Sequence, residues 1–289
     1  MEQVSNALAG ASVQRPNLLT NGGFEVWQRG AGAFSANGAY TADRWQISLG
    51  GSDTVNVARG SGASPGNYYL SMTVTHVAGG FAALKQDLKN SDGNQFKGKT
   101  LTFSADVSST TNLAILILAM DGTGAVNVNS PNHPGNSQWT RLSVTAPIPS
   151  DNTNVAVHLW ATGSGTVMID NAMLVVGSTP ADYVPMHPAD DLARCQRYYE
   201  IMYPEAFGYA VGGGQQVGYT HSFATAKAIS PTITQIGTFG VLNSVQPEIG
   251  VRAGQGLSGM YFHAVSLAAG PCWVSPASAA TYIVAESNP

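Results

Sequence analysis

Short segments that alternate apolar and polar residues, separated by turn-forming residues, constrain the fold of this chain more than any other feature. In Tyr68–Thr75 every second residue is apolar, and Leu101–Val107 repeats the pattern. A period of two is that of a β-strand with one buried face. Residues 113–120 form a continuous apolar run between polar turns, which predicts a strand covered on both faces.

Further strands are predicted at 139–145, 155–160 and 166–171, whereas residues 81–88 fit either a strand or a helix. Glycine, proline and asparagine mark the turns between them. Short strands at this spacing are typical of a sandwich or jelly roll. The sequence therefore predicts an all-β protein: a jelly-roll β-sandwich, then a short helix, then a second, smaller β domain.

The hydrophobic period changes once, after the prolines at 180, 185 and 188. Residues 190–202 carry apolar side chains at 192, 195, 199 and 202, a helical stripe that Asp190 and Asp191 would cap and Pro204 would end. We therefore expect an N-terminal arm at 1–16, the jelly roll at 17–177, a linker and helix at 178–203, and the C-terminal β domain at 204–289.

Composition excludes several classes of protein. The chain has 289 residues, of which only 10% are charged, and a net charge of −4 with 13 basic residues. Phosphate binding needs clustered lysine and arginine, so we expect no nucleic-acid partner. The longest apolar run, 113–120, is too short to cross a bilayer, so we expect no membrane insertion.

Cysteine usage and the N-terminus bear on the compartment. Cys195 and Cys272 have no metal-ligand spacing and are expected to be free. Residues 1–6 have neither the basic nor the apolar region of a signal peptide. Low charge and many turn formers are typical of external β proteins. The chain thus has the composition of an extracellular protein but is expected to be made without a signal peptide. This combination suits a virion component that folds in the host cytoplasm and is released by lysis.

Two acidic segments far apart in the sequence indicate a metal site. Residues 17–25 place Glu25 after a glycine-rich turn, and residues 166–171 place Asp170 at the end of an apolar strand. If the two segments lie side by side, their carboxylates and nearby carbonyls could form an oxygen cage for a hard cation. Alternatively, Glu25 pairs with Arg29 or Arg44, and Asp170 caps a turn.

Four segments, in order, resemble the jelly-roll carbohydrate-binding modules attached to xylanases and cellulases: Asn17–Glu25, Gly98–Val107, Gln138–Leu142 and Val167–Asn171. The resemblance covers roughly residues 17–177. It implies a sugar-binding sandwich whose opening and closing strands hold a structural calcium. The metal ligands would then be Asn21, Glu25 and Asp170.

A second resemblance, to tailed-bacteriophage fibre and appendage proteins, is carried by Glu25–Gly30, Ala39–Trp45 and Leu192–Glu200. It covers most of the chain and departs from the usual pattern at Tyr282–Pro289. It implies a homotrimeric virion protein that binds a host surface polysaccharide during adsorption. The arm at 1–16 would attach it to other virion proteins.

Aromatic and polar residues on predicted strands are candidates for glycan contact, because sugar recognition combines aromatic stacking with hydrogen bonds to hydroxyls. If the apolar residues of 155–159 face the core, His158 and Trp160 face outward. Trp160 is then either a sugar platform or a packing residue under a loop or a neighbouring subunit. Tyr69, after a glycine turn, is a rim candidate. Trp27 and Trp45 are expected to be structural.

The sequence gives no support for catalysis. No carboxylate pair sits in a recognisable glycosidase motif, no two histidines have metal spacing, and no serine lies in a nucleophile elbow. We therefore expect a non-enzymatic fibre or appendage protein. Two alternatives stay open: an architectural decoration or adaptor protein without glycan binding, and a carbohydrate-binding module linked to an enzyme.

Overall fold

The computed structural model of the protein describes residues 15–62, 67–89, 91–112, 114–121, 127–251 and 256–288. Most of the predicted arm, residues 1–14, lies outside the described residues. The chain forms two compact units, residues 1–186 and 187–289, and each is described here by itself. Among the described residues, no helix is long and apolar enough to cross a membrane.

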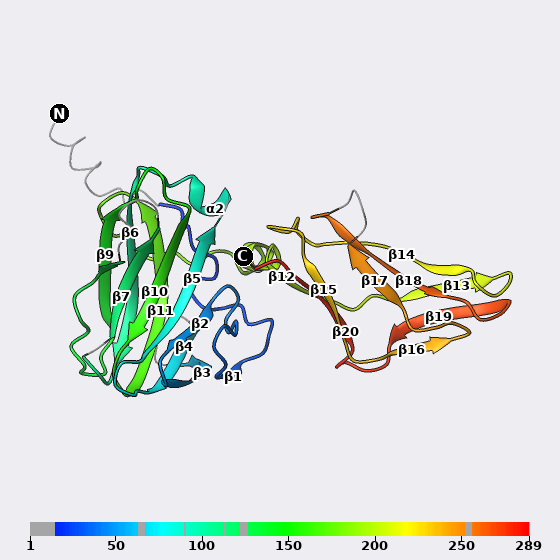
Figure 1. Cartoon of the computed structure of the whole chain (residues 1–289), viewed down its shortest axis with the longest axis horizontal. Helices are drawn as coiled ribbons and strands as arrows, with labels where there is room; N and C mark the ends of the chain where they lie inside the picture. The colour runs from blue at the N-terminus through cyan, green and yellow to red at the C-terminus, as the bar shows by residue number, and fades with distance from the viewer. Residues whose placement is uncertain are drawn as a thin grey trace. The chain divides into compact units, whose positions relative to one another are not determined.

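The described part of the first unit is built from two antiparallel sheets (Figure 1). The larger sheet contains, in spatial order, β1 (Gly32–Phe34), β3 (Thr54–Ser61), β4 (Tyr68–Thr75), β11 (Gly165–Val176), β6 (Thr100–Ser109) and β9 (Thr140–Pro147). The smaller contains β2 (Gln46–Gly50), β5 (Phe81–Lys89), β10 (Asn154–Ala161), β7 (Ala114–Met120) and β8 (Asn127–Asn129). A single turn of helix, α2 (Ser91–Asn94), follows β5.

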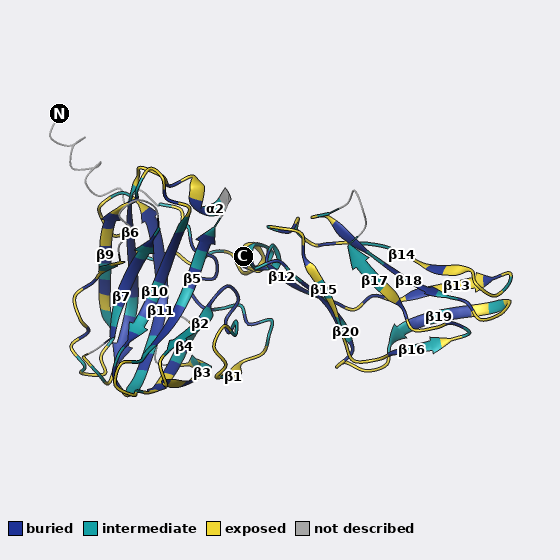
Figure 2. Ribbon diagram, viewed as in Figure 1, coloured by how far each residue is buried: buried dark blue, intermediate teal, exposed yellow. Residues whose placement is uncertain are grey.

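Alternation along the strands builds the core between the two sheets. In β4, Leu70, Met72 and Val74 are buried, while Thr73 and Thr75 are exposed. β7 is mostly buried along its length, as its continuous apolar run predicted (Figure 2). The predicted all-β sandwich is therefore confirmed, and residues 81–88 belong to a strand.

Aromatic side chains close the start of the sandwich. Trp45 is fully buried, its ring centroid lies 4.9 Å from that of Phe24, and its Nε1–H donates to the carbonyl of Asn21 at 3.0 Å. Trp27 is also buried and donates through Nε1 to the carbonyl of Phe24 at 2.6 Å. Both tryptophans therefore have the structural role expected for them.

The second unit is a smaller β structure, with three three-stranded antiparallel sheets in its described residues. In spatial order these are β12 (Tyr199–Met202), β20 (Tyr282–Glu286) and β15 (Thr232–Ile236); β13 (Ala206–Ala210), β19 (Gly270–Pro276) and β16 (Phe239–Leu242); and β14 (Gln216–Ser222), β18 (Gly259–Val265) and β17 (Glu248–Val251). Their shared core includes Phe239, Met260, Phe262 and Ile283.

The predicted helix over 190–202 is wrong in its second half. Helix α3 spans Pro188–Gln196 and is capped by His187, whose Nδ1 accepts from the amide of Ala189 at 3.2 Å. Asp190 and Asp191 lie in its first turn, where they suit the helix dipole. Residues 199–202 form β12 instead, because Tyr199–Met202 pair with the C-terminal strand β20. Cys195 and Cys272 are both free and buried.

Candidate functional site

The outer face of the five-stranded sheet carries a mixed row of side chains. Residues directly opposite each other in antiparallel strands share a face. One such row crosses all five strands and contains Gln46, Lys85, His158, Ile117 and Asn129. The sheet thus places amides, a cation and an imidazole side by side around apolar Ile117.

An aromatic stack lies next to this row. Trp160 follows His158 by two residues on β10 and therefore shares its face. The ring of Trp160 stacks on that of Phe81 with centroids 4.0 Å apart and an interplanar angle of 15°, and it lies 6.1 Å from the ring of His158. The packing partner of Trp160 is thus Phe81 of the same sheet, and Trp160 stays half-buried.

His158 is a half-buried imidazole at the centre of the row. Burial lowers the pKa of His158 from its ordinary value of 6.5 to about 4, with a partly opposing effect from Asp87 and a further lowering from Lys85. Its Nδ1 is buried and has no hydrogen-bond partner among the described residues. The ring is therefore uncharged at neutral pH.

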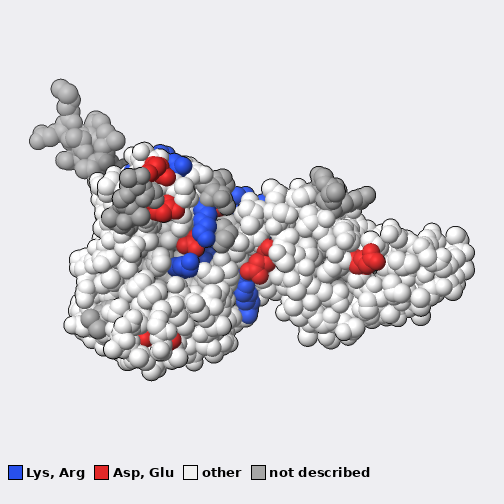
Figure 3. Space-filling view, viewed as in Figure 1, with Lys and Arg blue, Asp and Glu red and all other residues white. Residues whose placement is uncertain are grey.

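Charges of both signs lie next to each other along β5 on this face. Lys85 Nζ lies 3.0 Å and Lys89 Nζ 3.6 Å from Oδ2 of Asp87, so one carboxylate sits between two ammonium groups. Figure 3 shows basic and acidic side chains next to each other on the visible face of the first unit. The outer face therefore carries no strong field of one sign, which suits a neutral ligand.

Tyr69, the third predicted glycan residue, lies on the other sheet. It belongs to β4, and its ring meets that of Trp139 edge-on at 5.7 Å. A Cβ on Gly60, the direct partner of Tyr69 on β3, would lie 2.7 Å from the Tyr69 hydroxyl, so the ring rests over the Gly60 main chain. The structure thus brings His158 and Trp160 together and places Tyr69 apart from them.

The opening and closing segments do lie side by side, as the metal-site hypothesis required. The amide of Leu18 donates to the carbonyl of Leu174 at 3.0 Å, and the amide of Ala172 donates to that of Gly22 at 2.8 Å. Asn17 adds side-chain bonds to the main chain of residues 172 and 174. The opening segment thus lies beside β11 beyond Ile169, where the pairing of β11 with β4 ends.

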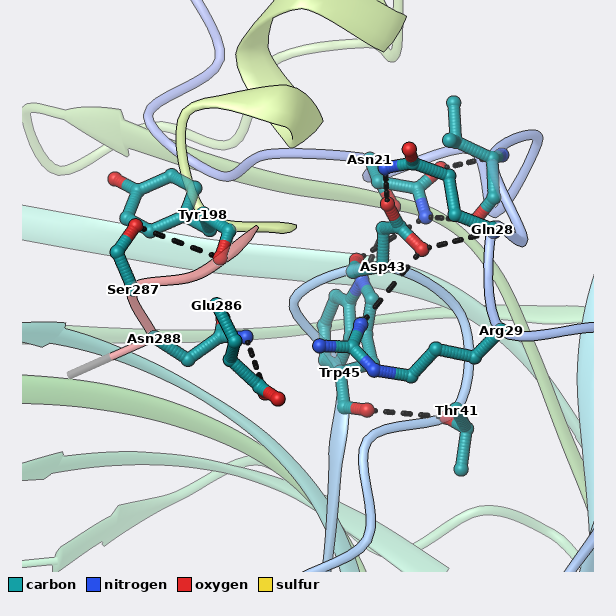
Figure 4. Close-up of polar contacts among 11 residues, drawn as sticks. Asn21, Gln28, Arg29, Thr41, Asp43, Trp45, Tyr198, Glu286, Ser287 and Asn288 are labelled. Atoms are coloured by element: carbon teal, nitrogen blue, oxygen red, sulfur yellow. Dashed lines mark hydrogen bonds and ion pairs between the residues drawn. The ribbon is translucent and has the colours of Figure 1, made fainter. Parts of the chain in front are cut away.

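Asn21 serves the local fold. Its side-chain oxygen accepts from the amide of Val26 at 3.0 Å, and its nitrogen donates to the carbonyls of Val26 at 2.8 Å and Asp43 at 3.2 Å. Figure 4 shows Asn21, Gln28 and Arg29 around Asp43. The carboxylate of Asp43 accepts from the main-chain and side-chain nitrogens of Gln28, and Arg29 Nη1 lies 3.9 Å from it.

The other two predicted calcium ligands take separate main-chain partners. Oε1 of Glu25 accepts from the amides of Asn67 and Tyr68 at 3.2 and 3.4 Å, and the fully buried Asp170 accepts from the amide of Asn171 at 2.7 Å. Within the described residues, no group of three or more His, Cys, Asp or Glu could hold a metal. Calcium stays a prediction.

Phe81 is the functional candidate that the sequence did not single out. Its segment, after Gly79 and Gly80, fits the period of either a helix or a strand. The sequence therefore does not show which way the Phe81 side chain points, and the pairing of β5 with β2 decides it. In that register Phe81 lies opposite Gly50, on the face that carries Trp160. The glycines around residues 50 and 80 were the only local signal.

Comparison with known proteins found similar solved structures but no matching sequence. No protein-family model matches the chain, and no curated protein sequence matches it. A similar solved structure is the enzymatically active domain of tailspike protein 4 of bacteriophage CBA120, with 14% identity and a TM-score of 0.41, covering 56% of this chain. The match spans only 21% of that tailspike chain.

Two further similar structures are carbohydrate-binding modules. The family 11 module of a cellulosomal cellulase of Clostridium thermocellum has 14% identity and a TM-score of 0.34, covering 52% of this chain and 98% of its own. A xylan-binding domain from Paenibacillus barcinonensis has 11% identity and a TM-score of 0.37, covering 59% of this chain and 100% of its own. At these values the similarities carry no argument about what this chain binds.

Proposed function

We propose that the first unit binds a polysaccharide on the outer face of its five-stranded sheet. The observation that carries this proposal is the Trp160–Phe81 stack beside the uncharged, half-buried His158. Aromatic surface can stack on the apolar face of a pyranose, while His158 and the amide of Gln46 offer hydrogen bonds to its hydroxyls. Asp87 offsets one of the two ammonium groups of Lys85 and Lys89, so no large positive cluster forms, and the proposed ligand is a neutral polysaccharide.

The biological setting of this binding is adsorption of a phage. We propose a structural component of a tailed-phage virion, a fibre or appendage, acting as a homotrimer. Support comes from the sequence resemblance of residues 25–30, 39–45 and 192–200 to such proteins. The N-terminal arm would contact other virion proteins, and the outer face would contact the host surface polysaccharide.

The proposed role is binding without hydrolysis. A glycosidase needs two carboxyl groups flanking the scissile bond. On the outer face, Asp87 is paired with Lys85 and Lys89, which suits a structural ion pair more than a general acid. Release of reducing sugar from the bound polysaccharide would contradict this part of the proposal.

The test is binding of the purified full-length protein to host cells and to their extracted polysaccharide. We expect Trp160→Ala to weaken saturable binding by more than about 1 kcal/mol, because it removes one ring of the stack. Tyr69→Ala is the matched control, since it removes a half-buried aromatic ring from the opposite sheet. Equal losses in the two variants, or none in Trp160→Ala, would move the site off the outer face.

A second candidate function is architectural, as a decoration or adaptor protein that binds protein and no glycan. One observation favours it. Phe207, Tyr209 and Leu242 of the second unit are 69%, 69% and 47% exposed, and exposed apolar clusters mark protein–protein contacts. Absence of polysaccharide binding by a correctly assembled oligomer would favour this candidate.

A further inference from the structure

The second unit has a hollow of about 390 Å³ against the β14–β18 pair (strands labelled in Figure 1). We call it the β14–β18 hollow, and its lining residues are Gln216, Gly218, Tyr219, Thr220, Tyr261 and His263. Its volume lies at the lower end of the range of small-molecule sites, roughly 300–1,000 Å³. It could hold one or two pyranose rings.

Two glycines open this hollow. Gly218 on β14 pairs directly with His263, and a Cβ at residue 218 would lie 2.5 Å from Cβ of His263. Gly250 on β17 pairs directly with Tyr261, and a Cβ at residue 250 would lie 2.7 Å from the Tyr261 hydroxyl. Glycine at 250 lets the Tyr261 ring rest over the neighbouring main chain, and glycine at 218 allows β14 to lie close to the main chain of β18.

The rings of Tyr261 and His263 form an aromatic floor. They lie two residues apart on β18 and hence on one face, with centroids 5.3 Å apart and an interplanar angle of 35°. Tyr219 also lines the hollow, but it lies directly opposite Phe262 and its ring points to the other face of the strand pair. Such a floor offers stacking surface, which an aliphatic lining would not.

Polar groups surround the floor in positions suited to hydroxyls. Nε2 of His263 is buried, and it lies 3.2 Å from Oε2 of Glu248 without hydrogen-bond geometry. The Glu248 side chain is 64% exposed, so its carboxylate can accept from a bound molecule. The amide of Gln216 is exposed on the same strand as Gly218. Hydrogen-bond donors and acceptors therefore lie next to the aromatic floor.

We propose that the β14–β18 hollow is a second saccharide-binding site, for one or two rings of a neutral sugar. None of its six lining residues is lysine or arginine, and the Glu248 carboxylate lies beside it, so phosphate and uronic acid groups are disfavoured. Aromatic, amide and carboxylate groups together match an uncharged polyol. The site belongs to the second unit and does not depend on the outer face of the first.

The experiment is calorimetric titration of the full-length protein with lactose, cellobiose and N,N′-diacetylchitobiose. The protein used carries Trp160→Ala, so that sugar binding at the outer face of the first unit contributes as little as possible to the signal. We expect saturable binding of at least one disaccharide, weakened about tenfold by Tyr261→Ala. Tyr209→Ala, which removes an exposed tyrosine from another sheet of the same unit, should leave the affinity unchanged.

Several results would overturn the proposal. One is the absence of saturable binding of all three disaccharides. Another is equal affinity with and without Tyr261→Ala. A third is a Tyr261→Ala variant whose sugar affinity is unchanged but which sediments as a smaller oligomer. The last would mean that a second copy of the chain covers the hollow. If Tyr261→Ala fails to fold, Gln216→Ala replaces it, because this exposed side chain leaves the core intact, and a several-fold loss of affinity is expected.

Discussion

The ring of Phe81 lies over the main chain of Gly50, its direct partner in the β2–β5 pair. A Cβ at residue 50 would lie only 2.5 Å from Cδ1 and 2.9 Å from Cζ of that ring. Because Trp160 stacks on Phe81 at 4.0 Å, the absence of a side chain at residue 50 sets the position of both rings. The proposed glycan-binding face thus depends on a glycine that touches no ligand.

The first prediction concerns Gly50→Ala. The added methyl group must displace Phe81 and with it the stack, so we expect a loss of about 1–3 kcal/mol in the free energy of unfolding. Polysaccharide binding should fall together with stability, as measured by urea denaturation and by binding to host polysaccharide. Gly212→Ala is the control, since a Cβ there would meet nothing within 4 Å. Binding that survives Gly50→Ala would separate Phe81 from the site.

Regular strands were predictable because their signal is local. Tyr68–Thr75 alternates in sequence and is β4 with the same bounds. The resemblance of residues 17–25 and 166–171 to opening and closing strands suggested that these segments lie side by side. In the structure, Leu18 and Gly22 pair with Leu174 and Ala172, just beyond the second segment.

What the sequence did not reveal depends on strand register. Tyr199 and Met202 continue a helical stripe, yet pairing with β20, some 80 residues away, makes them a strand. Gly50 and Gly250 read as ordinary turn or strand glycines until the register places Phe81 and Tyr261 opposite them. A tertiary pairing decides such positions, and periodicity within one segment cannot predict it.

The second prediction is a pH dependence of stability caused by His158. The folded chain binds its proton with a pKa of about 4 and the unfolded chain with the ordinary 6.5. Between these values the unfolded chain holds more protons, so stability is complete above pH 6.5 and falls as pH drops toward 4. The shift corresponds to roughly 3–4 kcal/mol.

Replacing His158 by Gln should remove this dependence. Urea denaturation at pH 7 and pH 4.5, followed by tryptophan fluorescence, measures it, because all tryptophans except Trp273 lie in the first unit. Asp87 and Lys85 are present in both proteins, so the difference between wild type and variant isolates the imidazole. An identical pH dependence in the two proteins would show that His158 is solvated.

The third prediction separates a hydrogen-bonding role of Asn21 from a metal-binding one. Asn21→Ala removes three bonds to main-chain groups and should cost about 2–3 kcal/mol of stability. The melting temperature should drop by the same amount in EDTA and in calcium. A wild-type melting temperature that rises with calcium, and no longer rises in Glu25→Gln, would instead support the predicted calcium site.

The fourth prediction concerns the buried pair of Lys227 and Glu200 in the second unit. Lys227 Nζ lies 2.5 Å from Oε2 of Glu200 and donates to the carbonyl of Gln196, and its side chain is fully buried. Burial lowers the pKa of Lys227, and the hydrogen bond and charge of Glu200 oppose this. Lys227→Met leaves a buried carboxylate without its cation, which should cost about 3–5 kcal/mol.

Hydrogen exchange of β12 and β20 peptides measures this loss within the second unit. The double variant Lys227→Met, Glu200→Gln should recover much of the protection, because no unpaired charge remains. Lys89→Met is the control, since Lys89 forms a partly exposed ion pair with Asp87 at 3.6 Å, and its loss should cost under about 1 kcal/mol. A small effect of Lys227→Met would mean that water reaches Glu200.

The fifth prediction tests where the proposed trimer forms. Phe207 and Tyr209 project from one face of β13, both 69% exposed, and Trp273 of β19 pairs directly with Phe207 and with Leu242 of β16. If this face is the contact between copies, Phe207→Ser with Tyr209→Ser should convert trimers into smaller species in sedimentation velocity. Val77→Ser changes a 47% exposed residue of the first unit and should leave the trimer intact. A double variant that stays trimeric would move the contact to another surface. The exposed side of helix α3 would then be the next to test, because α3 buries Asp191 and Cys195 and leaves the apolar Leu192 exposed.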